Sequence, residues 1–119
     1  MSEKQKLLIV DDSELNRDIL KEILGSSYDY LEAENGTQAI QILEVHPEID
    51  LMLLDINMPQ MNGFQVLEHM REFQWIDEVP VVMISSEESV EIMRKAYDLG
   101  ITDYISRPFD AVIVKKRVQ

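Results

Sequence analysis

Three aspartates in this chain stand where a carboxylate could react. Asp55 directly follows the apolar run LMLL, and the adjacent pair Asp11 and Asp12 follows the apolar run LLIV. A third apolar run, VVMI, ends at Ser85. Because ligands of open α/β sheets bind outside the carboxyl ends of the strands, we expect these side chains to share one crevice.

Crowded carboxylates indicate a cation site. Asp11, Asp12 and Asp55 would repel one another and resist full ionisation unless a positive charge lay among them. Mg²⁺ typically takes one or two carboxylates together with waters and phosphate oxygens, and Mn²⁺ favours the same oxygen ligands. An aspartate beside such an ion can itself attack phosphorus and form an aspartyl phosphate.

Composition excludes several classes of protein. A length of 119 residues suits one domain, and an apolar fraction of 45% argues against disorder. The absence of cysteine excludes disulfides, thiolate catalysis and cysteine-bound metals. No apolar run is long enough for a membrane helix and no signal peptide is visible, so we expect a cytoplasmic protein without membrane contact. The net charge of −12 opposes direct binding of nucleic acid.

Apolar, β-rich runs alternate with segments of helical period, which predicts parallel strands joined by right-handed helical crossovers. Leu15, Ile19 and Ile23 step by four and predict the buried face of a first helix, which Ser13 can cap and Gly25 can end. The predicted strands cover residues 6–10, 29–33, 50–54, 80–84 and 102–105.

A fifth helix is expected to begin near Asp110. Its apolar residues are Val112, Ile113 and Val114, and it breaks off in VKKRVQ after barely two and a half turns. This helix is therefore either incomplete in itself or truncated from a longer parent chain, and an output domain, if the parent chain has one, would lie beyond residue 119.

Four segments carry a family resemblance. They are LLIVDD at residues 7–12, LLDINMPQMNG at 53–63, PVVMISS at 80–86 and DYISRPF at 103–109. In this order and spacing they resemble the receiver domains of bacterial two-component response regulators, over essentially residues 1–119. The resemblance implies a flavodoxin-like, doubly wound sheet of five parallel strands in order 2-1-3-4-5, flanked by five helices.

The resemblance also implies site residues. Asp55 matches the phosphoacceptor, which takes a phosphoryl group from a sensor histidine kinase or a phosphotransfer protein. Mg²⁺ (or Mn²⁺) would be bound by the side chains of Asp12 and Asp55 and by the backbone carbonyl of Asn57, with Asp11 acting mainly through water.

The switch itself is implied by two further matches. Ser85 matches the hydroxyl residue that moves to hydrogen-bond the phosphate, and Tyr104 matches the aromatic residue that follows it inward. The face built by helix 4, strand 5 and helix 5 is where such domains usually form homodimers or contact an output partner.

Arg107 departs from the family, which nearly always has lysine there. Arginine keeps the charge, but its planar fork is bulkier and can grip phosphate through two nitrogens. We expect Arg107 to point into the acidic crevice and contact the phosphoryl oxygens, and without phosphate to pair with Asp55 or lean outward. The resemblance further implies a cis peptide bond between Arg107 and Pro108.

Two other functions stay open. The first is a degenerate receiver, in which Arg107 points to solvent and the domain is a phosphorylation-independent interaction module. The second is a Mg²⁺-dependent phosphohydrolase with an aspartyl nucleophile. Such enzymes carry a general acid two residues after the nucleophile, and Asn57 cannot serve as that acid, so turnover should be poor. We expect a phosphoacceptor switch that catalyses only its own phosphorylation and dephosphorylation.

Overall fold

The computed structural model describes residues 4–56, 58, 61–85, 90–107 and 109–118. Its five strands each lie within one residue of the predicted limits, and every predicted helix is present. The strands are β1 (Gln5–Val10), β2 (Tyr28–Ala33), β3 (Leu51–Asp55), β4 (Val81–Ser85) and β5 (Asp103–Ser106). The α-helices are α1 (Glu14–Leu24), α2 (Gly36–Val45), α3 (Gly63–Glu72), α4 (Val90–Asp98) and α5 (Ala111–Val118).

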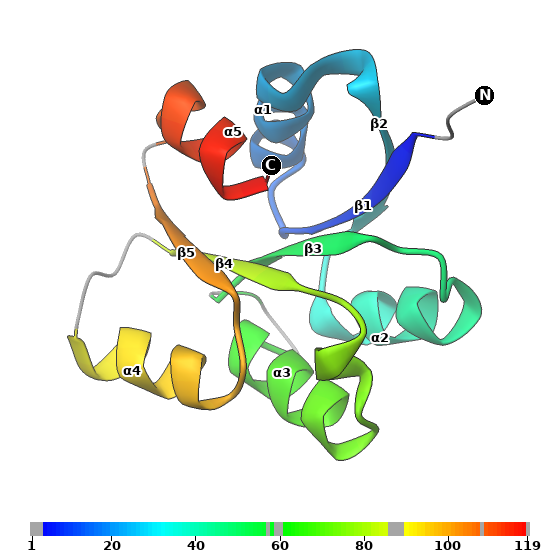
Figure 1. The fold of residues 1–119 in the computed structure, drawn as a ribbon, viewed down its shortest axis with the longest axis vertical. Helices are drawn as coiled ribbons and strands as arrows, with labels where there is room; N and C mark the ends of the chain where they lie inside the picture. Colours follow the sequence, from blue (N-terminus) through cyan, green and yellow to red (C-terminus); the bar gives the residue numbers. More distant parts are fainter. Residues whose placement is uncertain (1–3, 57, 59–60, 86–89, 108, 119) are drawn as a thin grey trace.

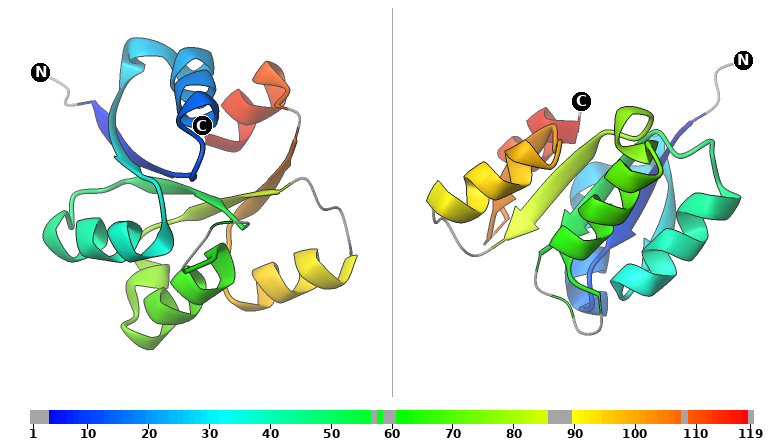
Figure 2. Two further views of the ribbon diagram at one scale, coloured as in Figure 1. Left: turned by 180° about the vertical axis from the view of Figure 1, so that it is seen from behind. Right: turned by 90° about the horizontal axis from the view of Figure 1, so that it is seen from below.

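The strands form one parallel sheet in the order β2-β1-β3-β4-β5. Helices cover both faces, with α1 and α5 on one side and α2, α3 and α4 on the other (Figure 1; Figure 2 shows the same layers from behind and from below). This confirms the predicted flavodoxin-like architecture. None of the helices in the described ranges has the length and apolar content that a membrane crossing requires.

Alternate strand residues feed two separate cores, because successive side chains of a strand point to opposite faces. On β3, Leu54 packs in the core beneath α2, α3 and α4, whereas Leu53 packs in the core beneath α1 and α5. Both side chains are fully buried. The near-continuous apolar runs of the central strands follow from this double coverage.

The buried face of α1 differs from the prediction. Leu15 is 68% exposed, whereas Leu20 and Leu24 are buried. Because α1 packs against α5 as well as the sheet, the row of side chains nearest both neighbours is buried. Ile23 lies at the edge of that core and is partly buried.

The apolar face of α5 also needs correction. Of the three consecutive residues predicted, Val112 and Ile113 are exposed and only Val114 is buried, together with Val118. Three consecutive residues point in three directions on a helix, whereas residues four apart lie on one face.

Candidate functional site

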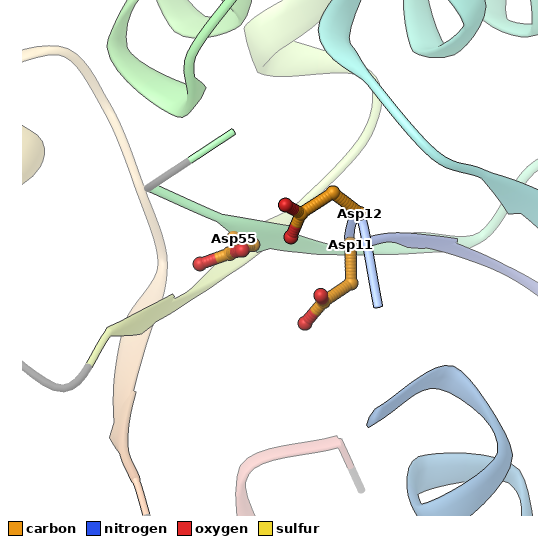
Figure 3. A group of neighbouring side chains, drawn as sticks. All are labelled: Asp11, Asp12 and Asp55. Carbon is orange, nitrogen blue, oxygen red and sulfur yellow. The ribbon is translucent and has the colours of Figure 1, made fainter. Parts of the chain in front are cut away.

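Three aspartates meet at the carboxyl ends of β1 and β3, which are neighbours in the sheet. One carboxylate oxygen from each of Asp11, Asp12 and Asp55 can be chosen so that all three atoms lie within 4.8 Å of one another. Figure 3 shows the three side chains gathered at these strand ends. Asp11 and Asp55 are buried and Asp12 is exposed, so the cluster opens to solvent on one side.

Asp11 is held from three directions. Its amide donates to the carbonyl oxygen of Ala33 at 3.0 Å, which ties it to the end of β2. Its Oδ1 accepts from the amide of Ser13 at 2.9 Å, and its carbonyl oxygen accepts from Nη1 of Arg17 at 2.6 Å. Burial raises the pKa of this carboxyl, whereas the Ser13 amide and the charge of Arg107 oppose the rise.

The backbone of Asp55 is packed tightly beneath the start of α3. The amide of Gly63 donates to the carbonyl oxygen of Ile56 at 2.9 Å. A Cβ atom at Gly63 would lie 2.6 Å from the carbonyl oxygen of Asp55, so only glycine fits there without movement. Asn62 and Gln65 form a reciprocal capping box that fixes where this helix begins.

Arg107 follows β5 and closes the cluster. Its amide donates to the carbonyl oxygen of Ser85 at 3.1 Å, which fixes the backbone beside β4. One guanidinium nitrogen, Nη2, pairs with Asp11 and lies 3.3 Å from Oδ1 of Asp55. The guanidinium carbon also lies 5.9 Å from the ring centre of Phe109. The expected pairing with Asp55 is therefore confirmed, and the closer partner, Asp11, was not foreseen.

The two residues expected to form the switch lie on neighbouring strands. Ser85 is fully buried at the end of β4, one residue beyond Ile84, which is in register with Asp55. Tyr104 on β5 is buried in the core that also contains Met83 and Ala96. Asn57 and Pro108 lie outside the described residues, so the carbonyl ligand and the cis peptide bond stay predictions.

The donor set fits a hard divalent cation. Carboxylate oxygens are the ligands that Mg²⁺ and Mn²⁺ prefer, and one exposed acid beside two buried ones leaves a route for the ion. Arg107 supplies one positive charge against three carboxylates, so an ionised cluster keeps a net negative charge. Asp11, Asp12 and Asp55 could therefore hold Mg²⁺ or Mn²⁺.

Sequence reasoning missed two residues beside this cluster. Arg17 on α1 contacts the backbone of Asp11, and Glu32 on β2 accepts a hydrogen bond from Arg17 Nε at 2.9 Å. The sequence did offer one signal for Arg17, because it is a basic residue in the first turns of the helix that follows the Asp11–Asp12 pair. Its partner on β2 could not be read from spacing.

Comparison with known proteins gives consistent matches. The family model described as "Response regulator receiver domain" matches residues 7–119. The chain is 34% identical to chemotaxis protein CheY1 of Helicobacter pylori, over 96% of this chain and 94% of that protein.

Solved structures give the same match. The structure of chemotaxis protein CheY4 of Vibrio cholerae superposes with a TM-score of 0.89 at 27% identity, covering 98% of both chains. The structure of the CheX-CheY-BeF3-Mg+2 complex from Borrelia burgdorferi also matches, with a TM-score of 0.87 at 32% identity, over 96% of this chain and 86% of that one.

Proposed function

This chain belongs to the response regulator receiver domains, and from that premise we propose that it accepts a phosphoryl group on Asp55 in a Mg²⁺-dependent reaction. Receiver domains are signalling switches rather than enzymes that turn over an external substrate. The observation that carries the proposal is the meeting of Asp11, Asp12 and Asp55 at adjacent strand ends. The donor is a phosphohistidine on a sensor histidine kinase or a phosphotransfer protein.

In the transfer step a carboxylate oxygen of Asp55 forms a new bond to phosphorus. The P–N bond to the donor imidazole breaks, and the imidazole leaves with the electron pair. Asp11, Asp12 and Asp55 would hold Mg²⁺, which would supply positive charge against the phosphoryl oxygens. The protein catalyses only this transfer and the later hydrolysis of its own aspartyl phosphate.

Arg107 and Ser85 stabilise the product. The guanidinium already lies beside Asp55, so it needs only a small movement to donate to the phosphoryl oxygens. The hydroxyl of Ser85, at the end of the neighbouring strand, supplies a neutral donor. Tyr104 is buried beside α4, and its movement after phosphorylation alters the surface of the domain.

The readout surface is the face formed by α4, β5 and α5. Val90 and Tyr97 of α4 and Val112 of α5 are exposed by 68%, 45% and 64%. Exposed apolar side chains on neighbouring elements suit contact with an output domain or a second copy of the chain. We propose that phosphorylation changes the affinity of this face.

The test uses acetyl phosphate, with Mg²⁺ or with EDTA, followed by intact-mass measurement at neutral pH. We expect one phosphoryl group per chain with Mg²⁺, none with EDTA, and none for Asp55→Asn, which keeps the shape of the side chain. Release of inorganic phosphate so fast that the phosphorylated chain stays a minor fraction in excess donor would instead support the phosphohydrolase, because a switch has to hold its phosphoryl group. No phosphoryl group under either condition would refute the proposal and support the interaction module.

A further inference from the structure

Arg17 reaches the peptide group that joins two of the three acids. Its Nη1 donates to the carbonyl oxygen of Asp11 at 2.6 Å, and its Nε donates to Oε1 of Glu32 at 2.9 Å. The side chain of Arg17 is only 12% exposed and that of Glu32 is 35% exposed, so the contact with the Asp11 carbonyl oxygen is the more shielded of the two. One guanidinium therefore ties α1 to the end of β1 and to β2.

This carbonyl oxygen belongs to the peptide between Asp11 and Asp12. A peptide group is planar, so its carbonyl oxygen and its two flanking Cα atoms keep fixed relative positions. A hydrogen bond that holds the oxygen therefore also restrains the backbone of both flanking residues. The Asp11 side chain has an additional anchor in the Ser13 amide, 2.9 Å from Oδ1. Asp12 is exposed, so its approach to Asp55 depends mainly on the backbone that Arg17 holds.

Glu32 directs Arg17 to this position. Without a partner on β2, the guanidinium would be attracted to the carboxylates of the cluster, where it would compete with a cation. The paired carboxylate of Glu32 balances the charge of Arg17, and Lys21 Nζ holds the other carboxylate oxygen at 2.9 Å. Hydrogen bonds from Lys21 and then Arg17 keep the pKa of Glu32 below its ordinary value, so the pair stays ionised at neutral pH.

We propose that Arg17 and Glu32 form a clamp that positions the Asp11–Asp12 peptide so that both carboxylates face the cation site. Arg17 is thus a positioning residue and does not touch the ion. This inference rests on the cation site of the proposed function. Residues that orient metal ligands commonly affect metal affinity by about 10- to 100-fold.

The test measures the dissociation constant of Mn²⁺ by titration calorimetry. The double variant Arg17→Met, Glu32→Met removes one positive and one negative charge, so the net charge is unchanged while the clamp is lost. We expect Mn²⁺ to bind about 10-fold more weakly than to the wild type. The matched control is the double variant Lys6→Met, Glu48→Met. It removes a different ion pair, 2.9 Å long, that includes none of the clamp residues and none of the three acids. The control should bind Mn²⁺ like the wild type.

Arg17→Lys separates positioning from simple stabilisation. A lysine ammonium lacks the fork that spans Glu32 and the Asp11 carbonyl, but it can still pair with Glu32. We expect a melting temperature close to that of the wild type together with weaker Mn²⁺ binding.

Equal Mn²⁺ affinity in the wild type, the double variant and Arg17→Lys would overturn the clamp and leave the cation site intact, even if melting temperatures fell. Failure of the wild type itself to bind Mn²⁺ would refute both the clamp and the proposed function.

Discussion

Arg107 should compete with the divalent cation, and Arg107→Gln tests this. Glutamine keeps much of the length of the side chain and removes its charge. At an effective dielectric constant of about 20, two unit charges at the observed 3.3 Å separation of Nη2 and Asp55 Oδ1 attract by about 5 kcal/mol. Removing one partner of a buried ion pair typically costs about 3–5 kcal/mol, since the remaining charge is left uncompensated.

The guanidinium side chain is 23% exposed, so we take the lower end, about 3 kcal/mol, for the loss in unfolding free energy without metal. For a domain of this size that corresponds to a fall in melting temperature of roughly 10 °C in EDTA. The cation can replace the missing charge in the variant, whereas in the wild type it must first weaken the contact of Arg107 with Asp11. If Mg²⁺ binding weakens the contact of Arg107 with Asp11 by about 1.4 kcal/mol in the wild type, the variant binds Mg²⁺ about tenfold more tightly.

The assay is thermal unfolding in EDTA and in increasing Mg²⁺, with calorimetric titration of both proteins at one pH. We expect a larger Mg²⁺-induced rise in melting temperature for Arg107→Gln than for the wild type. Arg94→Gln, which removes an exposed charge on α4, serves as the control and should follow the wild type. An equal Mg²⁺-induced rise in wild type and Arg107→Gln would refute competition between the guanidinium and the ion.

Three further outcomes are expected. Gly63→Ala should lower the unfolding free energy by about 1–3 kcal/mol in chemical denaturation, because the new Cβ would meet the Asp55 carbonyl oxygen; an unchanged midpoint would contradict this contact. Ser13→Ala should cost about 1 kcal/mol, since its side chain caps α1 by accepting from the Asn16 amide at 3.2 Å; Ser13→Asn, another good cap, should restore most of it. Hydrogen bonds from His46 and then Lys6 lower the pKa of Glu48 from 4.5 to about 2, so its stabilising effect is complete above pH 4.5 and is lost as pH falls towards 2. The difference in stability between wild type and Glu48→Gln should therefore shrink over that interval, and a constant difference would argue against the depressed pKa.

The shared location of the three acids could be predicted because it follows from the topology of the sheet. Parallel strands present their carboxyl ends at one edge, so correct strand assignments were enough to place the backbones of Asp11, Asp12 and Asp55 near one another. The partners of Arg107 were harder to predict, because Nη2 reaches both Asp11 and Asp55, and which of them lies closer depends on side-chain geometry that the strand order does not fix.

The buried face of α1 likewise could not be predicted from the local sequence pattern. Periodicity predicted the row through Leu15, but apolar residues occupy two adjacent rows of this helix. The row of Leu20 and Leu24 is buried because α5 lies beside α1, and the position of α5 follows from the whole fold. The contact of Arg17 with Glu32 likewise joins segments whose register is set only by the pairing of β1 with β2.

The strand order separates rigid from deformable parts of the molecule. Asp55 ends β3, the middle strand, which has hydrogen-bonded neighbours on both sides. Tyr104 lies on β5, an edge strand that pairs with β4 alone among the strands the structure describes. An edge strand has half the interstrand restraints and can be displaced at lower energetic cost. We expect backbone amides of β3 to exchange with deuterium only on global unfolding and those of β5 to exchange through local opening. Phosphorylation would add its charge at Asp55, in the stiff middle of the sheet. With such a gradient of stiffness, the resulting movement would be largest at β5, the edge strand.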